Sequence, residues 1–348
     1  MPISIYNYQN SKIPLMLELA ESYLERHYAG EYYLDNDWEN GPNTIIIFKD
    51  PNLEASILES IKAIVAAYKE KHPVSKEEVH KKAEKYARNQ HTLKQLELRD
   101  MEGHAQTMRA DGTVELRSRK NNAFNSQYHQ DMFDHYRTRL NSLYLDMMRI
   151  YIGLDTFHQT HMFLYMYHYL TSLYEDGSKR GYLSFLSHVE GFFSRLRLEG
   201  HNIDMKSEFE RRRTGILKDN KIILHDELAD AMDQWQQTWG LIAAEMNSQF
   251  RIENYQDESM LGLNEQYELL LENISPLDNS FHSELVRNKE LKSFILSKKM
   301  LVFRDIINLF YLSLPIFEQS MVKKQFYAYC TVKFIEENHK EDLLFVLD

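Results

Sequence analysis

A short segment in the middle of the chain combines four side chains that can transfer protons or stabilise negative charge. Ser187, His188 and Glu190 lie within four positions of one another, and Arg195 follows one to two helical turns later. Imidazole and carboxylate groups act as general acids and bases, whereas hydroxyl and guanidinium groups stabilise a developing oxyanion. The segment therefore predicts a site of proton transfer, although the same residues would also form an ordinary polar stripe on a helix.

Three histidines and a tyrosine recur at helical spacing just before this segment. His158, His161, Tyr165 and His168 are separated by three, four and three positions, so a helix brings them to roughly one face. Imidazoles in this arrangement could bind zinc. No acidic residue stands at ligand spacing beside them, and their neighbours are mostly aromatic residues or methionine. We therefore expect histidines of a core or a pocket wall, and no metal site.

Bulk properties exclude several other classes of function. A net charge of −11 disfavours a general nucleic-acid binder, and no segment approaches the 18 consecutive apolar residues of a membrane-spanning helix. The N-terminal residues lack the basic and then apolar pattern of a signal peptide. The single cysteine, Cys330, lies among aromatic residues and forms no intrachain disulfide, which fits a buried thiol in a reducing compartment. We expect a soluble, cytoplasmic protein.

The fold that must position these groups is predicted as α+β, with a small N-terminal mixed sheet and a larger, mainly helical region. Before residue 120, period-two and helical patterns alternate in the order of a split βαβ unit. Ser75 and Glu78 form a capping box, and Asp111-Gly112 predicts a hairpin between 106–109 and 113–119. The strands are expected at 3–8, 31–38 and 44–48, and helices near 14–24 and 55–68.

Helical periodicity dominates from Phe124 onward. We assign 1–120 to a sheet-containing region that is a candidate for peptide binding, and 121–348 to a helical region that forms one folding unit with it. Residues 200–222 and 252–261 are predicted connections, and the basic run Arg211–Arg213 is predicted to be a solvated helix face or loop. The expected helices are 126–151, 154–175, 180–199, 225–251, 263–273, 281–297, 300–312 and 316–338.

The stretch from Asp37 to Ile47, together with the order of the elements and the length, resembles the elimination-type C-terminal domain of lantibiotic dehydratases, including stand-alone versions from thiopeptide pathways. The family has a His where Asn43 stands, and Arg where Ile45 and Ile47 stand. Residues 313–320 also lack the late His and Arg of members that eliminate glutamate. Since elimination needs a base and cations for the leaving group, the resemblance does not favour simple elimination here.

The thiopeptide pyridine synthases are a branch of the same fold that is similar to this chain in size, in Trp38-x-x-Gly-Pro and in Ser187-His188-x-Glu190. That resemblance implies a formal aza-[4+2] cycloaddition of two dehydroalanines in a precursor peptide, with loss of water and of the leader peptide, and no cofactor. His188 would transfer protons, Glu190 would orient it or act as the acid, and Arg195 or a nearby Tyr would stabilise the oxyanion.

Substrate-binding candidates are Trp38, Asn43 and Tyr165. The partner implied by the resemblance is the precursor peptide, with its leader and modified core. Three alternatives stay open: a glutamate-eliminating partner of a split dehydratase, a catalytically silent protein that binds the leader or bridges other maturation enzymes, and an unrelated helical protein.

Overall fold

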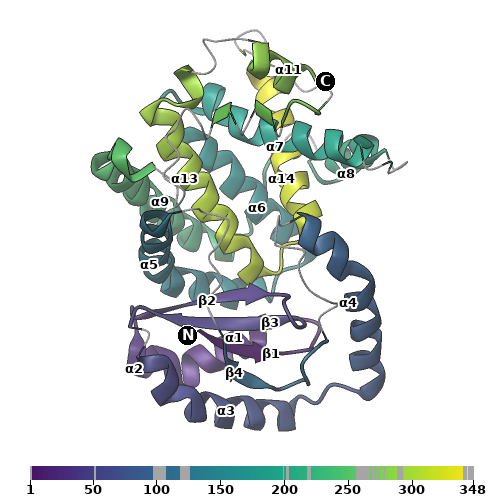
Figure 1. The fold of residues 1–348 in the computed structure, drawn as a ribbon, viewed down its shortest axis with the longest axis vertical. Coiled ribbons are helices and arrows are strands. Elements are labelled where there is room, and N and C mark those ends of the chain that lie inside the picture. The colour runs from purple at the N-terminus through teal and green to yellow at the C-terminus, as the bar shows by residue number, and fades with distance from the viewer. Residues whose placement is uncertain are drawn as a thin grey trace. The chain divides into compact units, whose positions relative to one another are not determined.

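The computed structural model describes residues 2–50, 52–96, 107–117, 126–198, 200, 204–217, 221–255, 267–268, 271–272, 274–277, 279–287, 293–339 and 343 (Figure 1). Contacts within the chain divide it into two compact units. Unit 1 comprises Met1–Ile152 and Ser313–Glu318, and unit 2 comprises Gly153–Leu312 and Gln319–Asp348.

A four-stranded sheet forms the centre of unit 1. Its strands are β1 (Ile3–Tyr6), β2 (Tyr32–Asp37), β3 (Asn43–Phe48) and β4 (Val114–Leu116), in the order β2-β3-β1-β4. The α+β class and the split βαβ arrangement are confirmed, because β3 lies between β1 and β2. The prediction of a mixed sheet is wrong, because the described strand pairs are all antiparallel. Strands β1 and β2 run in the same direction, but β3 lies between them, so they do not pair.

The helices before β4 follow the apolar pattern of the sequence. A helical stretch links β1 to β2 as α1 (Ile13–Leu19), a π-helical segment (Ala20–Leu24) and α2 (Glu25–Tyr28). Helix α3 (Leu53–Lys71) contacts β1, β3 and β4 and buries Ile57, Ile61 and Val65.

The predicted capping box opens α4 (Lys76–Leu96). The backbone nitrogen of Glu78 donates to Ser75 Oγ (3.2 Å), and that of Ser75 donates to Glu78 Oε2 (3.1 Å). Two backbone donors that the helix itself cannot satisfy are thereby bonded.

Helix α5 (Gln127–Tyr151) packs against the edge strand β2. Asn141 Oδ1 accepts from the backbone nitrogen of Leu34 (3.1 Å), and Arg137 forms an ion pair with Asp35 (2.9 Å). A sheet edge otherwise leaves its backbone donors open to pairing with another strand. The side chains of α5 therefore satisfy and cover this edge.

The segment 313–318 also packs within unit 1. Phe317 makes edge-to-face contacts with Tyr144 and Tyr151, and the carbonyl of Pro315 accepts from Asn36 Nδ2 (2.8 Å). These contacts give a structural role to the region in which the eliminating relatives were expected to carry His and Arg.

The hairpin predicted around Asp111 is wrong for the residues that the structure describes. Strand β4 pairs with β1 instead, and the Arg109 nitrogen donates to the carbonyl of Asn40 (2.9 Å). The side chain of Asp111 accepts from Tyr8 N (2.8 Å) and from Lys69 Nζ (2.6 Å). These tertiary bonds give the turn residues partners outside the local hairpin. Residues 106 and 118–119 lie outside the described ranges.

Unit 2 consists of helices in the residues that the structure describes. They are α6 (Thr156–Ser172), α7 (Ser178–Leu198), α8 (Met205–Ile216), α9 (Ala229–Gln249), α11 (Ser280–Arg287), α13 (Lys298–Ser313, whose last residue belongs to unit 1) and α14 (Met321–His339). Most of the predicted helix at 263–273, and part of that at 281–297, lie outside the described ranges.

The prediction of a connection over 200–222 missed α8. This helix is strongly polar, so it has little apolar periodicity, and it begins where the Asp204 carboxylate accepts from Ser207 N (3.0 Å). Its charged pairs, such as Arg211 with Glu208, lie one turn apart.

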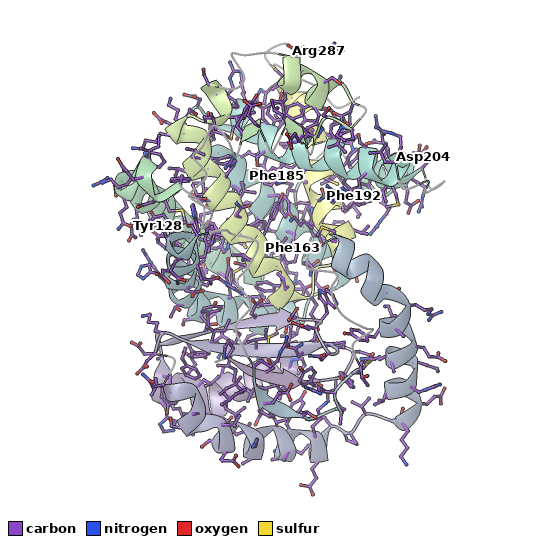
Figure 2. All side chains as sticks on the ribbon, in the orientation of Figure 1. Tyr128, Phe163, Phe185, Phe192, Asp204 and Arg287 are labelled. Atoms are coloured by element: carbon purple, nitrogen blue, oxygen red, sulfur yellow. The ribbon has the colours of Figure 1, made fainter. Side chains whose placement is uncertain are left out.

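An aromatic core holds α6, α7, α13 and α14 together. The Tyr167 ring lies 5.0 Å from Phe185 and 5.0 Å from Phe310, and Phe163 stacks on Tyr327 at 5.2 Å. Figure 2 shows Phe163 and Phe185 among these helices. Such spacings are those at which aromatic rings attract one another.

Within the described part of the chain, one stretch, Lys298–Phe317, is long and apolar enough to cross a membrane by length and composition alone. Of its most apolar window, 72% is buried inside the protein. A core helix of a water-soluble protein passes the same test, and the burial of this helix is typical of that class.

The turn from α6 into α7 depends on the small size of Gly181. A Cβ atom at this position would overlap the carbonyl oxygen of Thr171. We expect Gly181→Ala to lower the free energy of unfolding by about 1–3 kcal/mol, because overpacking forces the backbones apart. Chemical denaturation measures this change. The control is Gly215→Ala in α8, where nothing lies within 4 Å; it should be neutral or stabilising. Equal stability of both variants would contradict the close packing.

Candidate active site

The predicted proton-transfer residue, His188, is hydrogen-bonded to a tyrosine from another helix of unit 2. His188 lies on α7 and is mostly buried, and its Nδ1 is 2.9 Å from the hydroxyl of Tyr311 on α13. Lys324 of α14 lies over the face of the same tyrosine ring, with Nζ 3.5 Å from the ring centroid. Three helices thus contribute an imidazole, a phenol and an ammonium group to one cluster.

The environment keeps His188 neutral. Burial lowers its pKa to about 3, and the positive charge of Lys324 and then His282 add to the shift. Burial raises the pKa of Tyr311 well above 10, so the phenol also keeps its proton. A phenol is a stronger hydrogen-bond donor than a neutral imidazole, so we assign Tyr311 as the donor to Nδ1. His188 then carries its proton on Nε2.

Ser187 bonds to a second buried histidine, His282 of α11. The distance from Ser187 Oγ to His282 Nε2 is 3.2 Å, and His282 is only 2% exposed. Asn279 Oδ1 accepts from the His282 backbone nitrogen (2.9 Å), which fixes the amide so that its nitrogen faces His282 Nδ1 (2.9 Å). His282 Nδ1 is therefore the acceptor, and Nε2–H donates to Ser187. This histidine cannot act as the base that would make Ser187 a nucleophile.

The described hydrogen bonds of His188 include none of the other predicted candidates. Glu190 is 4% exposed and follows His188 by two positions, about 200° around the helix. Arg195 is exposed near the end of α7. Tyr165 on α6 accepts from Gln236 Nε2 (2.6 Å) and is half-buried. The described contacts therefore join His188 to Tyr311, and Ser187 to His282, rather than joining all the predicted residues in one group.

Trp38 and Asn43 belong to unit 1, at the turn between β2 and β3. Trp38 is partly exposed. Asn43 is fully buried, and its amide nitrogen donates to the carbonyls of Glu39 (3.1 Å) and Gly41 (3.0 Å). Gly41 adopts φ +108°, which favours glycine. Asn43 thus holds the turn that presents Trp38.

The histidines of α6 contribute to packing in the structure. His161 is buried and its Nδ1 accepts from Ile223 N (3.0 Å), whereas His168 packs against Phe334. Within the described ranges, no group of three or more His, Cys, Asp or Glu side chains could hold a metal ion. Cys330 is buried as expected, and burial raises its pKa well above the usual value.

The basic run lies on α8 and is paired with acidic side chains. Arg211 bonds to Glu208, and Arg213 bonds to Glu210 and Glu337. Arg212 lies over the ring of Phe326. The run lies on a helix, but the predicted solvated face is correct for Arg211 alone, because Arg213 is mostly buried in its ion pairs.

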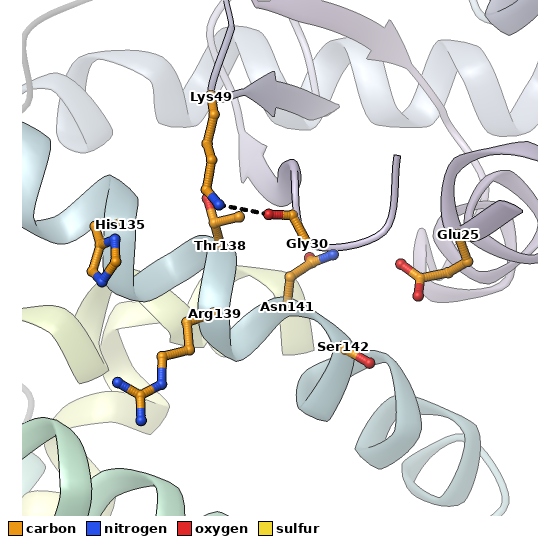
Figure 3. A pocket seen from close by; sticks show the side chains of 8 residues that line it. All are labelled: Glu25, Gly30, Lys49, His135, Thr138, Arg139, Asn141 and Ser142. Carbon is orange, nitrogen blue, oxygen red and sulfur yellow. Dashed lines mark hydrogen bonds between the residues drawn. The ribbon is translucent and has the colours of Figure 1, made fainter. Parts of the chain in front are cut away.

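Unit 1 also contains an open pocket of about 320 Å³, lined by α2, by α5 and by the chain just before β2 and just after β3 (Figure 3). Its lining carries the basic side chains of Lys49, His135 and Arg139 and the acidic side chain of Glu25. Lys49 Nζ donates to the carbonyl of Gly30 (2.7 Å). Most of these side chains are exposed, and none of them was predicted as part of a site.

Sequence reasoning missed Tyr311, His282 and Lys324. Each lies on a different helix from His188 and more than 90 positions further along the chain. No spacing rule connects residues across such separations. The only local signal was that Tyr311 belongs to an aromatic-rich helix, which is also typical of a core.

Comparisons with known proteins agree with this architecture. No protein-family model and no curated protein matches the chain. Among solved structures, the pyridine synthase TbtD from thiomuracin biosynthesis matches with a TM-score of 0.60 and 13% identity, covering 97% of each chain. The crystal structure of TsrL matches with a TM-score of 0.60 and 14% identity, covering 98% of this chain and 95% of the other. This chain has the fold of a thiopeptide pyridine synthase.

The pyridine synthase-like fold confirms the family resemblance that was inferred from the sequence. The likeness extends over nearly the whole chain, whereas the matching motifs were confined to about a dozen residues. At 13% identity the shared fold does not by itself identify the reaction.

The buried His282 should make stability depend on pH. Burial lowers its pKa to about 4, whereas an unfolded chain takes up the proton near 6.5. As the pH falls from about 6.5 to 4, the unfolded state therefore binds more protons, and the wild type should lose stability relative to His282→Gln. Urea denaturation at several pH values measures this difference. His27→Gln, at an exposed position of α2, is the control. A pH-independent difference for His282→Gln would contradict its burial as a neutral group.

Proposed function

We propose that this protein is a maturation enzyme for a ribosomally synthesised peptide, and that it forms a six-membered nitrogen ring from two dehydroalanines. The observation that carries the proposal is the neutral His188, bonded to Tyr311, in a chain with a pyridine synthase-like fold. TbtD is a pyridine synthase, and its structure matches this one over 97% of both chains. The substrate would be a precursor peptide.

The first chemical step requires a proton on an amide oxygen. One dehydroalanine must react as its imidic acid tautomer, in which the amide oxygen gains a proton and the amide nitrogen loses one. In our assignment His188 Nε2–H is the donor to that oxygen, and the neutral imidazole can act in both directions of proton transfer. A neutral imidazole has one nitrogen that donates and one that accepts, so it can exchange protons by reversing its tautomer. The burial that lowers the pKa of His188 keeps the imidazole in this neutral form.

The ring then forms by joining two carbon pairs. One bond links the two methylene carbons, and the other links the imidic carbon to the α-carbon of the second dehydroalanine. The imidic carbon loses its hydroxyl group, and the α-carbon of the second dehydroalanine loses the amide nitrogen that carries the leader peptide. Each group leaves with one proton from a former methylene carbon, as water and as the leader amide. These reaction steps are redox-neutral overall, so they require no oxidant. Holding both alkenes in contact replaces a bimolecular encounter and can supply much of the rate.

The remaining predicted residues keep narrower proposed roles. Glu190 is the candidate second acid on α7, and Trp38 is the candidate peptide contact in unit 1. Asn43 supports the turn of Trp38, because its amide nitrogen is already bonded to two carbonyls of that turn. Tyr165 and Arg195 remain candidates for contact with the substrate. Elimination of glutamate is not favoured, because Ile45 and Ile47 supply no cation.

A dehydroalanine-bearing, azole-containing precursor peptide tests the proposal. We expect the wild type to release an intact leader amide and a matching macrocycle, detected by mass spectrometry. His188→Ala should reduce the rate by about 100-fold or more, because it removes a general acid–base group. Tyr311→Phe should also reduce it, since Nδ1 loses its donor. His27→Ala, at an exposed position of α2, is the matched control and should react normally.

Other outcomes would contradict the proposal in different ways. A peptide that binds but stays unchanged would favour the silent leader-binding protein. Formation of dehydroalanine from a glutamylated peptide would favour the eliminating partner. Full activity of His188→Ala would place the chemistry elsewhere.

A further inference from the structure

We infer that Lys324 is a positioning residue that acts through Tyr311 and makes the phenol a proton donor to His188 during the reaction. The catalytic part of this inference rests on the proposed function. The effect of Lys324 on the resting state of His188 does not, because it depends only on the geometry of unit 2.

The contact between Lys324 and Tyr311 is close and directed. Nζ lies 3.5 Å from the ring centroid, well inside the limit of about 6 Å for a cation–π interaction. Tyr311 is in turn 2.9 Å from Nδ1 of His188. The order ammonium, phenol, imidazole is therefore fixed by side chains from α14, α13 and α7.

The positive charge of Lys324 has two consistent effects on this arrangement. It opposes a second positive charge on His188, which adds to burial in keeping the pKa of the imidazole low. It also attracts negative charge that develops on the phenol. Burial alone would make a phenolate costly, because the pKa of Tyr311 is raised well above 10. A cation over the ring lowers this cost during a transfer.

These effects allow a proton relay without a charged imidazole. As Nε2–H gives its proton to the amide oxygen of the substrate, Nδ1 takes the proton of Tyr311. The imidazole stays neutral with its tautomer reversed, and the negative charge lies on the phenol oxygen beside Lys324. When the amide nitrogen releases its own proton, Nε2 takes it and Nδ1 returns a proton to Tyr311. No proton is consumed.

The other titratable groups around His188 are compatible with this relay. His282 from α11 is also held neutral by burial, and its Nε2–H is directed to Ser187. Tyr167 from α6 packs 6.3 Å from the Tyr311 ring, and its buried hydroxyl has no hydrogen-bond partner among the residues that the structure describes. Lys324 is thus the cation that contacts the relay in the described part of unit 2.

The test combines nitrogen NMR of His188 with steady-state kinetics on the dehydroalanine-bearing precursor. In Lys324→Met, protonation of His188 should begin about one pH unit higher, because a nearby positive charge is lost. We expect kcat to fall by about 10-fold with KM unchanged, and Lys324→Arg to restore both readouts. Lys323→Met, one position away on α14, and Tyr167→Phe are controls that should change neither. Lys324→Gln serves as the second variant if Lys324→Met does not fold.

The outcomes separate this inference from the proposed function. If the wild type leaves the precursor unchanged while Lys324→Met still shifts His188, the proposed function fails and the electrostatic role of Lys324 stands. If the wild type forms the ring but Lys324→Met and Lys324→Gln match it in both readouts, the inference is overturned. A loss of rate that Lys324→Arg does not rescue, with an unchanged His188 resonance, would also overturn it, because the role would then be structural.

Discussion

The hydrogen bond between a neutral, mostly buried imidazole and a phenol is the interaction on which the account of this protein depends. An imidazole in water near neutral pH exchanges freely between charged and neutral forms. The aromatic packing of unit 2 removes that freedom for His188, and Tyr311 selects its tautomer. The helices α6, α7, α13 and α14 therefore do more than bury apolar surface. They hold one nitrogen as an acceptor, so that the other carries the proton.

In unit 1, polar side chains stabilise the edge of the sheet and the turn after β2. Its short sheet has an edge strand, β2, that would otherwise offer backbone donors to any passing strand. Asn141 satisfies Leu34 there, and Arg137 pairs with Asp35. The turn after β2 is held by the buried amide of Asn43, which leaves Trp38 partly exposed. Polar side chains thus bond to backbone groups at the edge and at the turn of the sheet, where the strands themselves supply no partner.

Local sequence rules predicted the elements well and the site only in part. The capping box of Ser75, the period-two strand at Ile3 and the long amphipathic helix at 126–151 are encoded within a few residues, so pattern alone identifies them. Helix α8 was missed because most of its residues are polar and Phe209 is the side chain that it buries, so its apolar periodicity is weak. The hairpin at Asp111 failed because its side chain bonds to Tyr8 and Lys69, far away in the sequence.

The candidate site shows the same division. His188 was identified because imidazole is the side chain suited to proton transfer near neutral pH, but its partner Tyr311 lies 123 positions away.

The most direct test is a crystal structure with a precursor in which one of the two dehydroalanines is replaced by alanine, so that no ring can form. We expect the remaining reactive amide oxygen to lie within hydrogen-bonding distance of His188 Nε2. A core peptide bound with that amide away from His188 would contradict it.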